Sequence, residues 1–492
     1  MANKIFNIKF LILLCMLFNS SFFAQKFEEI NNLADNYSNT ELLKNSQWAL
    51  YARYYDNNDV IIAKNENMSV APASGLKIVT SSAALDILGE QHRFDTKLYY
   101  DGIITDGSLD GNIVIVGGGD PCLGSDAVPG SLNLDDLMKV WMKAIEDLGI
   151  VEIKGSVLAD ELKYDSNPVP DHWEWIDLGN YYAAPSNALS INDNLYTLYF
   201  RPGNLAGDPA EFLRTEPEIP GMTFTNYMKT GVAGSGDNGY VYSAPLQFES
   251  VLRGTVPAGP DEFSIKGSIP DPALFAAQYL TKTLNDHFIS VLGEPGKVTE
   301  ERTYDESDVV FVSVSPPLKD IVYILNKKSN NVYAELLLKA ISYKKTGRGS
   351  TVDGVNHVER FLKDKLINTD GLTLYDGSGL SRANMVTARI MVELLTKNVE
   401  SSYFDSFYRS LAVVGDPEDI GYFRNTGIGT AIEKKAWIKS GVIVGVRSFS
   451  GYIQNKSGRA IVFSFIANNY DGSGSEVNRI HTELMTKLAE LK

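Results

Sequence analysis

Cysteine is nearly absent from this sequence, with only Cys15 and Cys122 among 492 residues. Cys15 lies in an N-terminal apolar run that we expect to be removed, which leaves Cys122 without a partner for an intramolecular disulfide. A lone cysteine with no identifiable partner histidine is more often a small buried residue than a nucleophile. Stability must therefore come from packed cores, and the chain length predicts roughly two to four domains.

Positive charge is also scarce, because 45 Lys and Arg face 61 Asp and Glu, for a formal net charge of −16. A surface this acidic has no electrostatic reason to bind nucleic acid or an anionic membrane. The 5 histidines show no metal-ligand spacing. The glycines at 117–119 lack the lysine and the spacing of a phosphate-binding loop. We therefore expect no nucleic-acid partner, no metal and no cofactor.

Long apolar runs are missing beyond the N-terminus. Lys4 and Lys9 precede an apolar run at residues 10–18, and the small residue Ala24 follows it. The run has about half of the ~20 residues that a transmembrane helix needs, and its flanks are typical of an export signal. We predict that residues 1–24 are a signal peptide and that the mature protein is periplasmic or secreted, with no transmembrane anchor.

The pattern of predicted helices and strands changes twice along the chain. Residues 72–88 predict a helix, with Gly89 as its C-terminal cap. From about residue 92 to 265, short strand-like runs alternate with turns rich in Gly, Asp and Asn, and helical patterns return after about residue 270. This order predicts a mixed α/β domain that is split in sequence.

We place the two parts of that domain at residues 25–95 and 268–492. The β-rich region between them, residues 96–267, is expected to be an insertion built as two nested small domains. Three strand-like runs close the chain before a final helix, and a hairpin at residues 455–458 joins the last two of them.

Ser74 and Lys77 are the first residues with catalytic potential. Cleavage of an amide or ester needs a nucleophile, a proton acceptor and donors for the oxyanion. Ser74 and Lys77 lie three residues apart on the predicted helix, so both side chains point to one face. Ser74 lies at the helix N-terminus, where the macrodipole favours developing negative charge. The spacing alone carries little weight, because Ser342 and Lys345 share it.

Two further motifs follow in a consistent order. Ser329-Asn330-Asn331 begins the apolar helix predicted at 332–341, and Lys439-Ser440-Gly441 lies on a strand with strands on both sides. Together with Ser74-x-x-Lys77 they resemble the signature of penicillin-binding enzymes. Other copies of the two later motifs are set aside. The copy at residues 190–192 lies inside the inserted region, and the copy at 229–231 precedes Ser329 and breaks the order. The copy at 345–347 lies in a polar run with no strand after it, and the copy at 456–458 is the hairpin turn.

The sequence resembles the D-alanyl-D-alanine carboxypeptidase/endopeptidase family, which is peptidase family S13 or the class C low-molecular-mass penicillin-binding proteins. The long separation between Ser74 and Ser329 is typical of this family. Further stretches carry the resemblance, at residues 118–121, 173–177, 182–185, 376–382, 445–447 and 451–452. The resemblance implies the fold of the penicillin-binding and serine β-lactamase-like transpeptidase domain, with β-rich domains inserted after the first active-site helix.

The family also implies a function. The expected enzyme is a serine D-Ala-D-Ala carboxypeptidase, with possible DD-endopeptidase activity, that acts on peptidoglycan stem peptides and is inhibited covalently by β-lactams. By position, Ser74 would attack the carbonyl of the penultimate D-alanine and Lys77 would take its proton. Ser329 would relay a proton towards the leaving amine.

The other motif residues are implied to bind the substrate. Asn331 would bind the substrate amide, and Lys439 and Ser440 would hold the terminal carboxylate, with Gly441 beside them. The backbone N–H groups of Ser74 and Val442 would form the oxyanion hole, in which one donor is typically worth roughly 3–4 kcal/mol.

Lys77 must be neutral to act as the base. At pH 7 only about one free lysine in 2500 is deprotonated, given a pKa of ~10.4. Burial and a second ammonium group nearby both lower a lysine pKa. The motif geometry makes Lys439 the second ammonium group.

Three residues outside the motifs are further candidates. Arg382 lies in a stretch that resembles a cleft-lining stretch of the family, and Trp175 and Asp177 would reach the substrate side chain from the insertion. A packed tryptophan and a solvated aspartate are an equally good interpretation of the last two. The sequence departs from the family at Val442, where Ser or Thr is usual, and at Ser440, which replaces Thr. These changes put recognition of the carboxylate in question.

Two alternative functions stay open at this point. One is a catalytically weak penicillin-binding envelope scaffold, for which Val442 is the only indication. The other is a β-lactamase or esterase on the same fold, which the long insertion disfavours. The balance of carboxypeptidase and endopeptidase activity is not set by these motifs.

Overall fold

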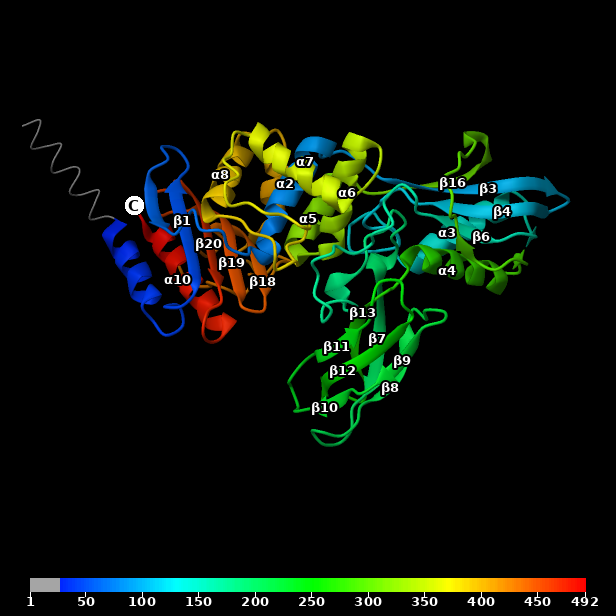
Figure 1. Ribbon diagram of the computed structural model, residues 1–492, viewed down its shortest axis with the longest axis horizontal. Helices are drawn as coiled ribbons and strands as arrows, with labels where there is room; N and C mark the ends of the chain where they lie inside the picture. The colour runs from blue at the N-terminus through cyan, green and yellow to red at the C-terminus, as the bar shows by residue number, and fades with distance from the viewer. Residues whose placement is uncertain (1–26) are drawn as a thin grey trace, which may run out of the picture.

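The computed structural model describes residues 27–492, so the predicted signal peptide at residues 1–24 lies outside the described residues. Strands from both ends of the described chain meet in one six-stranded antiparallel sheet (Figure 1), in the order β17-β18-β19-β20-β1-β2. The strands of this sheet are β1 (Gln47–Tyr54), β2 (Val60–Lys64), β17 (Ala412–Val413), β18 (Ala436–Ile443), β19 (Val446–Gln454) and β20 (Ala460–Asn468).

Helices cover both faces of this sheet. A helix at residues 27–38 and α10 (Gly474–Glu490) share a core with one face. The opposite core is built with the remaining helices of this part, α2 (Lys77–Leu88), α5 (Leu318–Lys328), α6 (Asn331–Thr346), α7 (Thr351–Asp364), α8 (Ala388–Val399) and α9 (Phe404–Ser410). Because both faces are covered, β20 is buried from Ile461 to Asn468 and its sequence is almost continuously apolar.

Helix α2 lies inside the helical layer. Its residues from Lys77 to Leu85 are all buried, which explains why its sequence has no polar stripe. The helix predicted from residue 72 begins instead as a single 3₁₀ turn, η1 (Ala73–Leu76), and becomes α-helical at Lys77. Ser74 therefore lies in the 3₁₀ turn, just before the first α-helical residue.

The insertion contains a seven-stranded sheet. Its first two strands, β3 and β4, form a hairpin whose turn residues Asp106 and Gly107 both have positive φ, as a tight two-residue turn requires. Two helices pack against this sheet, α3 (Leu134–Asp147) and α4 (Pro272–Asp286). The strands are β3 (Asp95–Thr105), β4 (Ser108–Val116), β5 (Glu152–Ile153), β6 (Val157–Asp160), β14 (Ser290–Val291), β15 (Gly296–Lys297) and β16 (Val309–Val314).

A second, smaller β unit projects from the insertion (Figure 1). It consists of a three-stranded sheet, β13-β7-β8, and a four-stranded sheet in which β12 pairs with β9, β10 and β11. The strands are β7 (Leu195–Arg201), β8 (Glu211–Glu216), β9 (Thr223–Asn226), β10 (Lys229–Gly231), β11 (Asn238–Tyr242), β12 (Glu249–Pro257) and β13 (Phe263–Ser268). Short 3₁₀ turns lie at η2 (Tyr181–Ala183), η3 (Asn192–Asn194) and η4 (Glu306–Asp308).

Two elements beyond residue 267, the predicted end of the insertion, pack on its seven-stranded sheet. Helix α4 packs on β6, and β16 pairs with β3 along the edge of the seven-stranded sheet. The helical pattern of α4 indicates that one face is buried but does not identify the sheet that buries it. We propose that the insertion spans residues 95–314, with the seven-stranded sheet and the smaller β unit as its two parts.

Two further sequence expectations concern single features. Cys122 is a free cysteine and is buried, as expected of a lone cysteine. Between residues 27 and 492, no helix is both long enough and apolar enough to span a bilayer.

Candidate active site

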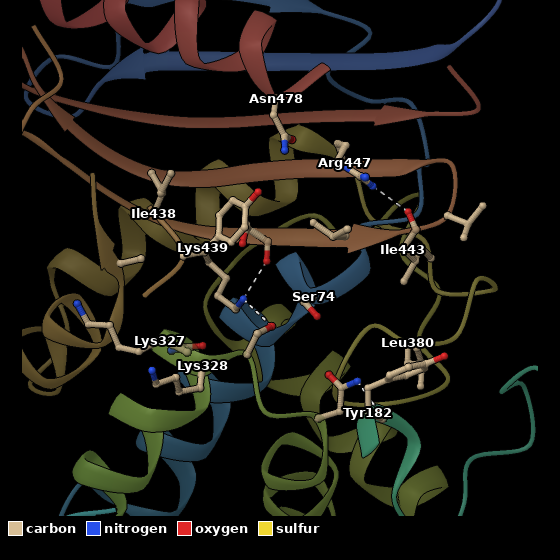
Figure 2. Close-up of a pocket in the computed structure, with 18 of the residues that line it drawn as sticks. Ser74, Tyr182, Lys327, Lys328, Leu380, Ile438, Lys439, Ile443, Arg447 and Asn478 are labelled. Atoms are coloured by element: carbon tan, nitrogen blue, oxygen red, sulfur yellow. Dashed lines mark hydrogen bonds between the residues drawn. The ribbon is translucent and has the colours of Figure 1, made fainter. Parts of the chain in front are cut away.

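A cavity of about 550 Å³ lies between β18, the turn at Ser74, the junction of α5 and α6, and the segment around Tyr182 (Figure 2). Most of the residues singled out in the sequence line it, namely Ser74, Asp177, Ser329, Asn331, Arg382, Lys439, Ser440 and Val442. Lys77, Gly441 and Trp175 are not among the lining residues. The tertiary structure thus brings together side chains that are separated by hundreds of residues in the sequence.

Lys77 lies directly beneath Ser74 and is fully buried. Its Nζ contacts three oxygen atoms: Ser74 Oγ at 2.9 Å, Asn331 Oδ1 at 2.5 Å and the Ser378 carbonyl at 2.7 Å. These three partners match the three protons of an ammonium group. When Lys77 is neutral, its lone pair can instead accept the proton of the Ser74 hydroxyl across the same contact.

Burial dominates the electrostatics of the two buried lysines. Burial lowers the pKa of Lys77 to about 7, although the carboxylates of Asp376 and Glu335 favour its charged form. The repulsion between the two ammonium groups that the motif geometry predicts is present, and it disfavours having both lysines charged. Burial, and after it the charge of Lys77, lowers the pKa of Lys439 well below its usual value.

Ser329 and Lys439 form the second contact of the site. Ser329 ends α5 in the left-handed conformation, with φ of 59°, so the chain turns sharply before α6 begins. Asn330 caps α6 by accepting a hydrogen bond from the Tyr333 N–H. Lys439 Nζ donates to Ser329 Oγ at 2.9 Å and to the Ser440 carbonyl at 2.8 Å.

Asn331 connects the lysine to the opposite wall of the cavity. Its Oδ1 accepts from Lys77, and its Nδ2 donates to the Tyr182 carbonyl at 2.6 Å. Both ends of the amide therefore have protein partners, which leaves one N–H and one lone pair for a substrate.

Strand β18 contributes several residues to the cavity lining, but Gly441 is not one of them. Ser440 and Val442 line the cavity, and Val442 is 47% exposed. Gly441 faces the turn that carries Ser74, where an added Cβ would come within 2.3 Å of the Pro72 carbonyl oxygen. A glycine at this position lets β18 approach the nucleophile turn closely.

Of the three candidates outside the motifs, Arg382 and Asp177 line the cavity and Trp175 does not. Arg382 pairs with Glu174 at 2.7 Å and donates to the Val444 carbonyl at 2.8 Å. The pKa of Asp177 is raised, because the effect of burial exceeds that of its hydrogen bond with Tyr182, which lowers the pKa. Trp175 is 60% exposed, and its ring lies 4.9 Å from that of Tyr242.

Two residues near Lys77 were missed. Glu335 is fully buried, and burial raises its pKa to about 7. Lys339, two helical turns beyond Asn331, is also fully buried. The sequence does contain an indication of both, because two charged residues stand inside the apolar run of α6. Charged side chains are rarely buried unless they have hydrogen-bond or ion-pair partners.

Comparison with known proteins agrees with this geometry. The sequence model of the D-Ala-D-Ala carboxypeptidase 3 (S13) family matches residues 30–490. The D-alanyl-D-alanine carboxypeptidase of Actinomadura sp. (strain R39) is 29% identical over 420 residues, which cover 84% of this chain and 76% of that protein.

Solved structures show the same fold. Penicillin binding protein 4 (dacB) from Haemophilus influenzae has a TM-score of 0.78 at 22% identity, over 93% of this chain and 98% of that one. A structure of the same protein complexed with a β-lactam has a TM-score of 0.74 at 21% identity, over the same shares. The fold class predicted from the sequence is thereby confirmed. With a family match over nearly its whole length, the chain belongs to the D-Ala-D-Ala carboxypeptidase 3 (S13) family and is a serine D-Ala-D-Ala carboxypeptidase.

Proposed function

We propose that this carboxypeptidase works through an acyl-enzyme on Ser74, with Lys77 as the general base. The observation that carries the proposal is the 2.9 Å contact between Lys77 Nζ and Ser74 Oγ at the cavity. With its pKa at about 7, Lys77 is neutral in about half of the molecules at pH 7, compared with roughly one in 2500 for a free lysine. The base is therefore available without an external proton acceptor.

The reaction begins when Ser74 Oγ attacks the carbonyl carbon of the penultimate D-alanine while its proton passes to Lys77 Nζ. The N–H groups of Ser74 and Val442 stabilise the resulting oxyanion. Ser329 then relays a proton to the nitrogen of the terminal D-alanine, and the proton that Lys77 accepted replaces it, so that Lys77 is neutral again when the step ends. Lys439 Nζ contacts Ser329 Oγ at 2.9 Å and holds it in place. The C–N bond breaks, free D-alanine leaves, and water hydrolyses the ester on Ser74.

Binding roles follow from the positions around the cavity. Lys439 and Ser440 hold the terminal carboxylate, with Gly441 keeping β18 close to the nucleophile. Asn331 binds the amide of the substrate through its remaining hydrogen-bonding capacity.

Residues from the insertion side contact the substrate side chain. Asp177 and Arg382 line the cavity, and Trp175 lies on the same segment as Asp177, two residues away. The open cavity also admits the longer substrate of an endopeptidase, in which a second peptide replaces the terminal D-alanine.

The substrates are peptidoglycan stem peptides, and β-lactams acylate Ser74 in their place. Support for the second point comes from the similar Haemophilus influenzae protein, which has been solved in complex with a β-lactam. A periplasmic or secreted location follows from this substrate and from the predicted signal peptide.

Intact-mass analysis after treatment with penicillin tests the proposal. The wild-type protein should gain the mass of one penicillin, and Ser74→Ala should gain none. Ser457→Ala, which changes the serine of an unrelated Lys-Ser-Gly copy in the hairpin turn, is the matched control and should react fully. A full adduct on Ser74→Ala would refute the role of Ser74. A penicillin adduct without D-alanine release from the wild type would favour the scaffold function.

A further inference from the structure

Three polar side chains lie on one face of α6, whose residues 332–342 are all buried and mostly apolar. Asn331, Glu335 and Lys339 follow one another at four-residue intervals, so their side chains lie one above the other along the helix. Glu335 and Lys339 are both 0% exposed. Burying charged groups is costly unless their hydrogen-bonding capacity is satisfied, so the partners of these two side chains are informative.

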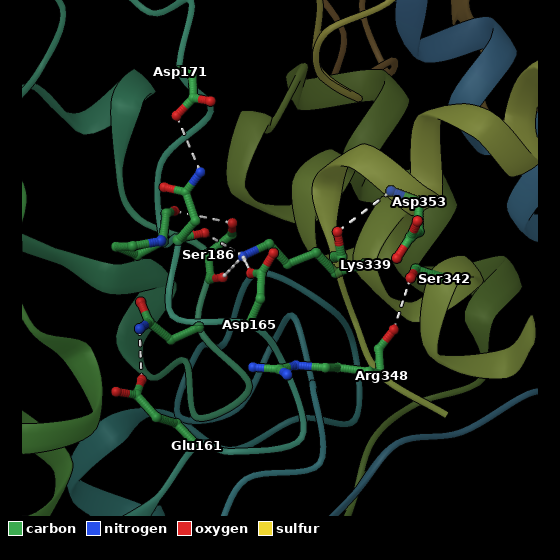
Figure 3. Close-up of polar contacts among 12 residues, drawn as sticks. Glu161, Asp165, Asp171, Ser186, Lys339, Ser342, Arg348 and Asp353 are labelled. Carbon is green, nitrogen blue, oxygen red and sulfur yellow. Dashed lines mark hydrogen bonds and ion pairs between the residues drawn. The ribbon is translucent and has the colours of Figure 1, made fainter. Parts of the chain in front are cut away.

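All partners of Lys339 belong to one segment of the insertion (Figure 3). Lys339 Nζ donates to Asp165 Oδ1 at 3.0 Å, to the Asn167 carbonyl at 2.6 Å and to the Ser186 carbonyl at 3.0 Å. An ammonium group has three protons, and all three are used here. We call residues 165–186 the wall segment.

The wall segment forms one side of the substrate cavity. Asp177 and Tyr182, both within it, line the cavity. The segment is attached at two further points near the reacting groups. The Tyr182 carbonyl accepts from Asn331 at 2.6 Å, and Trp173 Nε1 donates to Asp376 Oδ2 at 2.9 Å. Lys339 therefore holds both ends of a segment whose middle faces the substrate.

Glu335 acts on the opposite side, through the loop that contacts Lys77. Its carboxylate accepts the N–H of Gly377 at 3.0 Å and that of Ser378 at 2.8 Å. The carbonyl of the same Ser378 accepts from Lys77 Nζ at 2.7 Å. Glu335 thus fixes the carbonyl that orients the lysine without contacting the lysine itself.

We propose that Glu335 and Lys339 are positioning residues of the carboxypeptidase reaction, in which Glu335 places Lys77 through the Ser378 carbonyl and Lys339 holds the wall segment against α6. The functional motif that begins at Ser329 then continues for two more helical turns. Because these roles presuppose the Ser74–Lys77 chemistry proposed above, the tests measure acylation and substrate binding separately.

Lys339→Met tests the wall segment. Methionine fills a similar volume but donates no hydrogen bond, so the segment should lose its attachment while Ser74 and Lys77 keep theirs. We expect KM for a stem-peptide substrate to rise at least tenfold, with kcat and the rate of penicillin acylation within threefold of wild type. Lys297→Met is the matched control, because Lys297 pairs with Glu161 and Asp271 within the insertion. Its KM should be unchanged.

The outcomes separate the two proposals. If wild type forms no penicillin adduct on Ser74, the proposed function fails. If wild type forms it and Lys339→Met keeps the wild-type KM, the positioning role of Lys339 fails. Should Lys339→Met not fold, Asp165→Asn provides the second variant, because it weakens one of the three contacts and should raise KM in the same direction. An unchanged KM in Asp165→Asn would then overturn the role.

Glu335→Gln should change kcat and not KM, the reverse of the effect expected for Lys339→Met. Lys77 faces the charged groups Glu335, Asp376 and Lys439. In glutamine, an NH2 group that can only donate replaces one carboxylate oxygen, and it would face the Gly377 N–H that Oε2 accepts at 3.0 Å. The substitution also removes a negative charge that favours protonated Lys77. We expect kcat to fall at least tenfold with KM within threefold, and the acid limb of the acylation rate to move to lower pH.

A purely structural role would lower stability without moving the pH profile. The surface variant Glu359→Gln, which loses only an exposed ion pair with Lys363, serves as the control for handling and charge. Wild-type kcat together with a wild-type pH profile in Glu335→Gln would overturn the positioning role of Glu335.

Discussion

The rate of Ser74 acylation by penicillin should rise with pH through an ionisation near pH 7. Only neutral Lys77 can accept the serine proton, and burial lowers the pKa of Lys77 to about 7. The neutral fraction is then about one half at pH 7 and about one hundredth at pH 5. The acylation rate constant should therefore fall about fiftyfold between these pH values.

The lowered pKa also gives the factor by which burial increases the neutral fraction of Lys77. A lysine at its ordinary pKa of ~10.4 would be neutral in roughly one molecule in 2500 at pH 7, so burial increases the active fraction on the order of a thousandfold. Lys77→Arg should lose most acylation at every usable pH, because arginine stays protonated. Lys456→Arg, in the exposed hairpin turn, is the matched control and should behave as wild type.

The assay is the single-turnover rate of penicillin adduct formation, followed by intact mass from pH 5 to 9. Far-UV circular dichroism at each pH shows that the protein stays folded. A rate that is constant from pH 5 to 8, or one whose midpoint lies above pH 9, would refute the assignment of Lys77 as a base of lowered pKa. Near-wild-type acylation by Lys77→Arg would refute it independently.

Three further changes test other parts of the site. Val442→Thr restores a hydroxyl beside the cavity and should raise kcat/KM roughly tenfold to a hundredfold on peptides ending in free D-Ala-D-Ala, with much less change on the C-terminal amide. Gly441→Ala places a Cβ within 2.3 Å of the Pro72 carbonyl oxygen, so β18 or the Ser74 turn must move. The rate of Ser74 acylation, measured by intact mass, should then fall more than tenfold. Gly296→Ala, whose Cβ would meet only Leu158 Cδ2 at 3.6 Å, is the control. Lys327→Met leaves the buried carboxylate of Asp419 unpaired and should lower the free energy of unfolding by about 3–5 kcal/mol in urea.

Each of these has a contradicting result. Equal gains of Val442→Thr on the acid and the amide would show that the hydroxyl does not serve the carboxylate. Wild-type acylation by Gly441→Ala would show that the close approach of β18 is not required. A double variant of Lys327→Met with Asp419→Asn should recover part of the lost stability, and a further loss would contradict the ion-pair account.

Much of the local structure could be predicted from the sequence, because its signals are local. The helix predicted to end at residue 88, with Gly89 as its cap, ends there, and the helix predicted at residues 332–341 lies within α6 (Asn331–Thr346). The hairpin turn at residues 455–458 joins β19 and β20. Alternation, turn residues and helix caps act within a few residues, so one sequence is enough to find them.

The motif residues were also accessible from sequence, since order and context selected Ser74, Lys77, Ser329, Asn331 and Lys439 from several copies. The lowered pKa of Lys77 and burial as its cause were predicted, but the extent of burial depends on everything that packs around α2. The order of the motifs predicts that Lys439 lies near Lys77, but only tertiary packing excludes the water that would otherwise screen the charge of each lysine.

The remaining features were decided by tertiary structure alone. The pattern of α4 shows that one of its faces is buried, yet only the folded chain places that face on the seven-stranded sheet. Trp175 lies outside the cavity and Asp177 lines it, although only one residue separates them. Glu335 and Lys339 stand in an apolar run as two isolated charges, and their meaning depends on carbonyl and N–H groups from distant segments. A sequence specifies which groups must be buried or paired, and the three-dimensional fold determines which partners they meet.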